Sequence, residues 1–113
     1  MIKKSEDMRH EIRTNVREGK GEVTFIHMLE KEEMPGKARL AARLIIPVGG
    51  SIGSHTHDPD AEIYVILSSV ALVSDNGVDR TLQAGDVMYT CGENHSISNI
   101  GETTLELIAI VIE

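Results

Sequence analysis

Cysteine and aromatic residues are the scarcest components of this 113-residue chain. It has one cysteine, Cys91, no Trp, one Phe and two Tyr. A single cysteine excludes an internal disulfide framework and a zinc site built from several cysteines. With so few aromatic rings, the core has to be built from Ile, Val, Leu and Met. We expect Cys91 to be a small residue in a turn, although its thiolate could also react or coordinate a metal.

Positive charge is also in short supply. Eleven Lys and Arg residues stand against 18 Asp and Glu residues, which gives a net charge of −7. This balance argues against a nucleic-acid partner, because binding to phosphates depends on Lys and Arg side chains that displace counterions. The sequence also lacks the run of about 18 apolar residues needed to cross a bilayer, and its first residues lack the apolar segment of a signal peptide. We therefore expect a cytoplasmic protein with no membrane partner.

What the sequence does contain is a series of short apolar runs separated by turn residues. From Gly21 onward this pattern is typical of an all-β sandwich or barrel, and the length fits a single domain. The dipeptide Asn76-Gly77 accepts positive φ at both central turn positions and predicts a tight hairpin. The expected strands cover Glu22–Leu29, Lys37–Pro47, Ser51–His57, Glu62–Leu67, Val70–Ser74, Val78–Leu82, Val87–Tyr89, His95–Asn99 and Thr104–Ile112.

The two ends of the chain raise separate questions. Residues 1–20 are expected to form an arm that precedes a barrel domain over residues 21–113. Apolar residues spaced four apart in this arm fit one stripe of a short helix, but alternate residues from His10 to Val16 also fit one face of a strand. We favour the extended arm.

The strand expected over Thr104–Ile112 is apolar on both faces. A strand buried on both sides needs cover outside the barrel. A second subunit is the economical source of that cover and favours a homodimer. The alternative is that the N-terminal arm folds over this strand within one chain.

Three histidines and one glutamate carry the chemistry that the sequence suggests. His55 and His57 are two apart, so in a strand both imidazoles lie on the same face. Glu62 follows a turn over residues 58–61 and brings a carboxylate beside them, and His95 lies on a later strand. Three imidazoles and one carboxylate suit one divalent ion such as Mn, Fe, Co, Ni, Zn or Cu. If the coordination is octahedral, two positions stay open for water or substrate.

Two segments of the chain resemble the two motifs of the cupin family. The first reads Gly-x5-His-x-His-x4-Glu from Gly49 to Glu62, and the second reads Gly-Asp…His-x3-Asn from Gly85 to Asn99. The resemblance covers roughly residue 37 to the C-terminus. It implies a double-stranded β-helix, an antiparallel barrel of jelly-roll type, with the four metal ligands pointing into it from one end.

The sequence departs from the cupin pattern at two places. Ser69 stands where the family usually has a Gly that closes the first motif. The second motif is one residue shorter ahead of His95 and has Cys91-Gly92 without the usual Pro. We expect the shortening to lie in a loop, because a one-residue change inside a strand would turn His95 to the other face.

Two further residues are candidates for a catalytic role. Tyr64 shares the strand parity of Glu62 and should line the same cavity. His27 alternates with apolar residues, so core or interface packing is favoured for it over catalysis. Because Glu62 is expected to be a ligand, a proton acceptor would have to come from one of these two side chains.

The site and the resemblance support two functional hypotheses. The first is a metal-dependent enzyme of the dioxygenase, isomerase or lyase type, acting on a small oxygenated metabolite that the metal chelates and polarises. The second is a non-catalytic module that binds a small molecule or a metal. The fold does not distinguish between them, since the same barrel serves many functions.

Overall fold

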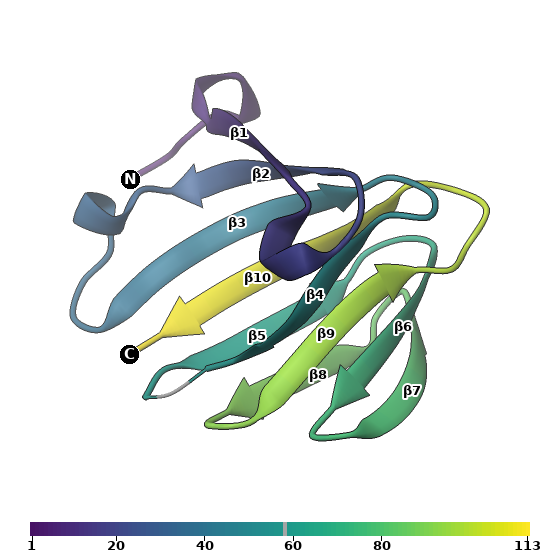
Figure 1. The fold of residues 1–113 in the computed structure, drawn as a ribbon. Coiled ribbons are helices and arrows are strands. Elements are labelled where there is room, and N and C mark those ends of the chain that lie inside the picture. The colour runs from purple at the N-terminus through teal and green to yellow at the C-terminus, as the bar shows by residue number, and fades with distance from the viewer. Residues whose placement is uncertain (58) are drawn as a thin grey trace.

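Ten antiparallel strands form two sheets in the computed structural model, which describes residues 1–57 and 59–113. The six-stranded sheet has the order β1-β2-β3-β10-β5-β8, and the four-stranded sheet has the order β4-β9-β6-β7 (Figure 1). The strands are β1 (Arg9–Thr14), β2 (Glu22–Leu29), β3 (Ala38–Ile46), β4 (Ser51–Thr56), β5 (Ala61–Ile66), β6 (Val70–Asp75), β7 (Val78–Gln83), β8 (Val87–Cys91), β9 (Asn94–Asn99) and β10 (Leu105–Ile112). One 3-10 turn, η1 (Ser5–Asp7), precedes β1, and two others, η2 (Val16–Glu18) and η3 (Lys31–Glu33), connect β1 to β2 and β2 to β3.

The alternation of apolar and polar residues predicts this architecture well. All nine expected strands are present, with bounds shifted by at most two residues. The hairpin between β6 and β7 has Asn76 at φ 50° and Gly77 at φ 81°, as the Asn-Gly pair predicts. The turn expected over residues 58–61 includes residue 58, which lies outside the described residues. The double-stranded β-helix is therefore the fold of this chain.

The N-terminal segment adds a tenth strand to the sheet. Strand β1 pairs antiparallel with β2, from Arg9 opposite His27 to Thr14 opposite Glu22. The helical alternative is thus wrong for residues 9–14, and the extended one is confirmed. The register places Arg9, Glu11 and Arg13 on the same side of the sheet as His27. The division of the chain at residue 21 stays a prediction.

The core lies between the two sheets and is aliphatic, as the composition requires. Alternate residues of β3 and β10 point into it, and Leu44, Leu105, Leu107 and Ala109 are almost completely buried. Tyr64 and Phe25 are the two aromatic side chains within it. No helix in the described ranges is long and apolar enough to span a bilayer.

The outer side of the six-stranded sheet is also largely apolar, with the Arg43–Glu106 ion pair as a charged exception. The pairing register aligns two neighbouring cross-strand rows over β3, β10, β5 and β8. One row contains Arg43, Ile108, Val65 and Val87, and the other contains Ala41, Ile110, Ile63 and Tyr89. Val87 and Tyr89 are more than half exposed. We call these eight residues the outer apolar face.

Candidate metal centre

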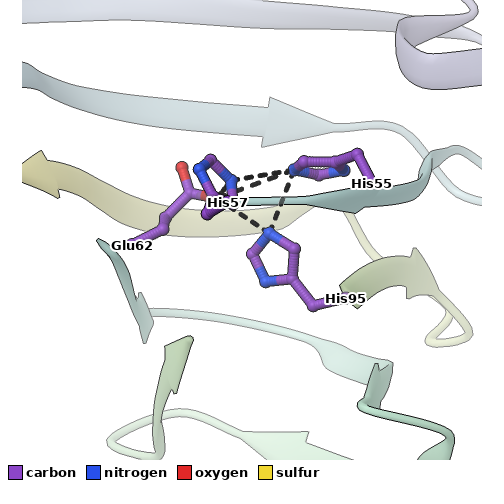
Figure 2. A group of neighbouring side chains, drawn as sticks. All are labelled: His55, His57, Glu62 and His95. Atoms are coloured by element: carbon purple, nitrogen blue, oxygen red, sulfur yellow. Dashed lines mark hydrogen bonds and ion pairs between the residues drawn. The ribbon is translucent and has the colours of Figure 1, made fainter. Parts of the chain in front are cut away.

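The four predicted ligands converge at one place inside the barrel (Figure 2). His55 lies near the end of β4, His57 just after it, Glu62 on β5 and His95 on β9. Four ligand atoms, one from each side chain, lie within 4.8 Å of one another. Two strands of the smaller sheet and one of the larger sheet therefore supply a single cluster, as the spacing in the sequence predicts.

A bulge in β4 aims His55 into the barrel. Ile52 pairs with Ile97, but the next paired residue is His55, opposite His95, so the register shifts between them. Ile52 and His55 are three residues apart and would point to opposite sides of a regular strand. The inserted residue of a bulge changes this parity, so both side chains face inward. The sequence gives no alternation signal for this bulge, and we did not predict it.

Each histidine uses its Nδ1 for a partner outside the cluster. Nδ1 of His55 lies 2.8 Å from the carbonyl oxygen of Gly53. Nδ1 of His57 lies 2.9 Å from a carboxylate oxygen of Asp60, and Nδ1 of His95 lies 3.0 Å from the hydroxyl of Thr90. Such contacts orient metal-binding imidazoles and leave Nε2 free for the ion.

Sequence reasoning missed these three partners of the candidate ligands. Gly53 and Asp60 lie two and three residues from the histidines that they hold, and Thr90 lies across the β8–β9 turn from His95. No residue type marks them, since backbone carbonyls, aspartates and hydroxyls occur throughout the chain. Proximity to a predicted ligand is the only signal that could have found them.

The Nε2 atoms of the three histidines face one another at spacings that suit a bound cation. Nε2 of His55 lies 3.0 Å from Nε2 of His57 and 3.0 Å from Nε2 of His95. The Gly53 carbonyl and the Asp60 carboxylate accept hydrogen bonds, so Nδ1 of His55 and of His57 is the donor in these contacts and Nε2 of each ring faces the cluster. Two donors that bind one octahedral ion at about 2.1 Å are about 3.0 Å apart, which agrees with these spacings. The donor set fits a divalent metal.

Glu62 completes the cluster with a buried negative charge. Its Oε1 lies 2.9 Å from Nε2 of His57 and 3.0 Å from Nε2 of His95, yet it has no partner in hydrogen-bonding geometry among the described residues. Burial raises the pKa of this carboxyl group, but the surrounding His55, His95 and His57 lower the pKa more, to about 2. Glu62 is therefore a charged, incompletely satisfied acceptor at neutral pH, as a metal ligand would be.

The cluster opens into a cavity of about 410 Å³. Its walls are apolar around Phe25, Leu44 and Ile52, and its lining includes His55 and His57. Five of the chain's eleven Lys and Arg residues line it, namely Arg9, Arg13, Arg17, Lys31 and Arg39. Of the 18 acidic residues, two within the described ranges do so, Glu30 and Glu32. The charged residues that line the cavity of this acidic protein are therefore mainly cations.

The two candidate catalytic residues both line this cavity. Tyr64 is buried and stacks on the ring of His95 with 5.2 Å between the ring centroids. Burial and the negative charge of Glu62 raise the pKa of Tyr64 well above its ordinary value, so its hydroxyl is a hydrogen-bond donor rather than a proton acceptor at neutral pH. His27 is buried, and its Nε2 lies 2.8 Å from Oε1 of Glu11 on the N-terminal strand.

The departures from the cupin motifs are absorbed in turns. The two residues between β8 and β9 are Gly92 and Glu93, and Gly92 has φ 71°, so the shortening lies in a loop and His95 points inward. Ser69 takes the left-handed conformation, with φ 67°, that explains why glycine suits this position.

Cys91 is exposed at the end of β8. Asn99 donates to the carbonyls of Ile46 and Thr103 and so stabilises a turn.

Comparison with known proteins agrees with the fold and the motifs. The family model described as a cupin domain matches residues 42–111. An oxalate-binding protein of Thermotoga maritima is 47% identical over 113 residues, which cover 99% of this chain and 93% of that protein. A crystal structure of a predicted oxalate decarboxylase from Thermotoga maritima is also 47% identical, with a TM-score of 0.94 and coverage of 99% of this chain and 98% of that one.

More distant structures share the fold alone. The cupin domain of Schizosaccharomyces pombe Cnp3 is 16% identical and has a TM-score of 0.73, over 90% of this chain and 67% of that one. The family match spans more than half of the residues and includes all four predicted ligands. The chain belongs to the cupin family.

Proposed function

We propose that this protein binds one divalent transition metal through His55, His57, Glu62 and His95, and that it captures a small anionic oxygen chelator such as oxalate on that metal. The convergence of three imidazole Nε2 atoms and a buried carboxylate carries the first half of the proposal. A divalent ion at this place would act as a Lewis acid toward the oxygens of the bound ligand. The identity of the metal is left to measurement.

The charge distribution around the cavity supports an anionic ligand. The whole chain carries a net charge of −7, which would repel an anion at long range. Among the charged residues that line the cavity, cations outnumber carboxylates by five to two. The name of the Thermotoga maritima relative, an oxalate-binding protein, agrees with this polarity and supports a small dicarboxylate as the ligand class.

Chemical conversion of the bound ligand is the second candidate, and one observation favours it. His27 lines the cavity, and its Nε2 contacts Glu11, so a carboxylate–imidazole pair faces the same space as the metal ligands. Such a pair is the usual form of a general base. The function would then be that of a metal-dependent dioxygenase, isomerase or lyase rather than that of a binding module.

We also propose that the protein is a homodimer in which a second copy covers the outer apolar face. The N-terminal segment does not supply this cover in the described part of the chain, since β1 extends the edge of the sheet beside β2. Exposed Val87 and Tyr89 continue the rows centred on Ile108 and Ile110. Contiguous apolar surface of this kind is typical of subunit interfaces.

Calorimetric titration tests the proposed function. Protein loaded with Mn²⁺ is titrated with oxalate, and the metal-free protein is the control. We expect saturable binding of oxalate that requires the metal. Oxalate recovered unchanged after incubation under air would favour the binding module, whereas formate, carbon dioxide or oxygen uptake would favour an enzyme. Absence of oxalate binding by the metal-loaded protein would contradict the proposed ligand class.

A further inference from the structure

Most of the cations that line the cavity are already neutralised by carboxylates. Arg9 binds Glu30 through two nitrogens, at 3.2 and 2.9 Å. Arg13 also binds Glu11 through two nitrogens, with both contacts at 3.0 Å. The remaining paired cation is Arg39, whose partners are Asp60 and Glu113. These three guanidinium groups offer few free donors to a ligand.

Arg17 differs from the other lining arginines. Arg17 lines the same cavity as His55, His57 and Tyr64. It forms no ion pair or side-chain hydrogen bond with any other residue of 1–57 and 59–113. Lys31 is likewise unpaired within those ranges and, like Arg17, is exposed on a 3-10 turn, but its ammonium group is a single-point charge. A guanidinium offers a planar fork of donors that matches a carboxylate.

The backbone at Arg17 is held in a conformation that its residue type disfavours. Arg17 has φ 54° and Glu18 has φ 65°, both in the left-handed region. Residues with a Cβ rarely adopt this region unless they are Asn or Asp. Strain of this kind persists only where surrounding contacts impose it, and it concentrates at functional sites.

The contacts that impose this conformation come from the strand that carries His55. Figure 1 shows the η2 turn beside β4. A Cβ at Gly53 would lie 2.0 Å from the carbonyl oxygen of Arg17, and a Cβ at Gly19 would lie 2.2 Å from that of Ser51. The amide of Ser51 donates to the carbonyl of Lys20 at 2.8 Å. The turn is therefore packed backbone against backbone on the metal-bearing strand.

We infer that Arg17 binds the carboxylate of the anionic ligand and thereby selects dianionic chelators over neutral ligands of the metal. This inference rests on the proposed function, because the ligand must already lie on the metal. Its own support is the combination of a cavity-lining guanidinium that has no partner among residues 1–57 and 59–113 and a strained turn packed against β4. Arg17 is thus a specificity-determining residue supplied by the N-terminal segment, outside both cupin motifs.

The test compares two probes on the same metal-loaded variants. Oxalate carries two negative charges, whereas imidazole is a neutral ligand of the metal. Wild type, Arg17→Gln, Arg17→Lys and Arg80→Gln are loaded with Mn²⁺, checked for equal metal content and titrated with each probe. Arg80 is the matched control, because it is an exposed arginine on β7 away from this cavity.

We expect Arg17→Gln to raise the Kd for oxalate at least tenfold, since charge-assisted hydrogen bonds to a carboxylate are lost. Its Kd for imidazole should stay within twofold of the wild-type value. Arg17→Lys should be intermediate, and Arg80→Gln should match wild type for both probes.

A variant of the turn tests whether its packing positions the arginine. Gly19→Ala keeps Arg17 but forces the turn away from Ser51. It should weaken oxalate binding in the same direction as Arg17→Gln, with circular dichroism showing an intact fold. Normal oxalate affinity in Gly19→Ala would contradict the positioning role of the turn.

The outcomes separate this inference from the proposed function. Wild-type oxalate affinity in Arg17→Gln would overturn the role of Arg17 and leave the proposed function standing. Equal weakening of oxalate and imidazole would also overturn it, because the arginine would then act on the metal centre and not on ligand charge. If wild type itself binds metal but no oxalate, the proposed ligand class fails, and this inference fails with it.

Discussion

The hydroxyl of Thr90 lies 3.0 Å from Nδ1 of His95, and both side chains are almost completely buried. This contact holds the imidazole of the candidate ligand that comes from the second cupin motif. Because the His95 ring also stacks on Tyr64, its orientation is fixed from two directions. Nε2 is then left to face the other ligands.

Removing this hydroxyl should weaken metal binding without disturbing the fold. Thr90→Val keeps the shape of the side chain but loses the hydrogen bond to His95. Loss of such an orienting partner lowers metal affinity by about 10- to 100-fold. Competition with a chelator measures the effect, and Thr90→Ser, which keeps the hydroxyl, is the control. Equal affinities of Thr90→Val and wild type would show that His95 needs no such support.

Acid should destabilise the protein partly through Glu11. The hydrogen bond from Arg13, followed by that from His27, lowers the pKa of Glu11 to about 2. The folded-state pKa lies below the unfolded value of 4.5, so the stabilisation is complete above pH 4.5 and is lost as the pH falls toward 2. Glu11 is partly exposed, so solvent screening limits the contribution to about 1 kcal/mol.

Glu11→Gln should therefore lower the free energy of unfolding at pH 7 by about 1 kcal/mol. The difference from wild type should shrink as the pH is lowered below 4.5. Urea denaturation at several pH values provides the measurement, with Glu22→Gln, at an exposed position, as the control. A difference that stays constant with pH would mean that the Glu11 charge is not the cause.

Much of the fold and of the metal centre could be predicted from the sequence, because both depend on regular alternation. The inward-facing residues of β3 and β10 follow directly from the alternation of side chains between the two faces of a strand. The same alternation places the imidazoles of His55 and His57 on one side. The bulge at residues 53–54 breaks this period and leaves no apolar pattern to read. The left-handed backbone at Arg17 likewise could not be predicted from the sequence, because a glycine is the usual sign of such a conformation and this position holds an arginine.

Ser69 illustrates how a departure from the family pattern is accommodated. Its hydroxyl lies 2.9 Å from the carbonyl oxygen of Thr103 and 3.3 Å from Oδ1 of Asn99, which offsets the cost of its φ of 67°. Ser69→Ala loses the hydrogen bond and keeps the strain, so it should reduce the free energy of unfolding by about 1–2 kcal/mol. Ser69→Gly also loses the hydroxyl but relieves the strain.

We therefore expect Ser69→Gly to be more stable than Ser69→Ala by about 1 kcal/mol. Denaturant titration of the two variants and of wild type provides the comparison. If alanine proved as stable as glycine at this position, the left-handed conformation would not be a constraint.

The proposed homodimer makes a prediction about one residue at the centre of the outer apolar face. Ile108 pairs with Arg43 on β3 and with Val65 on β5. Ile108→Lys introduces a charge there and should convert a dimer into a monomer, as measured by light scattering during size-exclusion chromatography. Val78→Lys is the control, since Val78 is an exposed apolar residue on the other sheet. A wild-type protein with the mass of one chain would contradict the dimer.

Metal content is the measurement that tests the central claim most directly. Mass spectrometry is applied to purified protein and to the His55→Ala/His95→Ala variant, each before and after reconstitution with Mn²⁺, Fe²⁺, Ni²⁺ or Zn²⁺. We predict nearly one divalent ion per chain in the wild type and its loss in the variant. Wild-type protein that retains none of these ions after reconstitution would contradict the proposed metal centre.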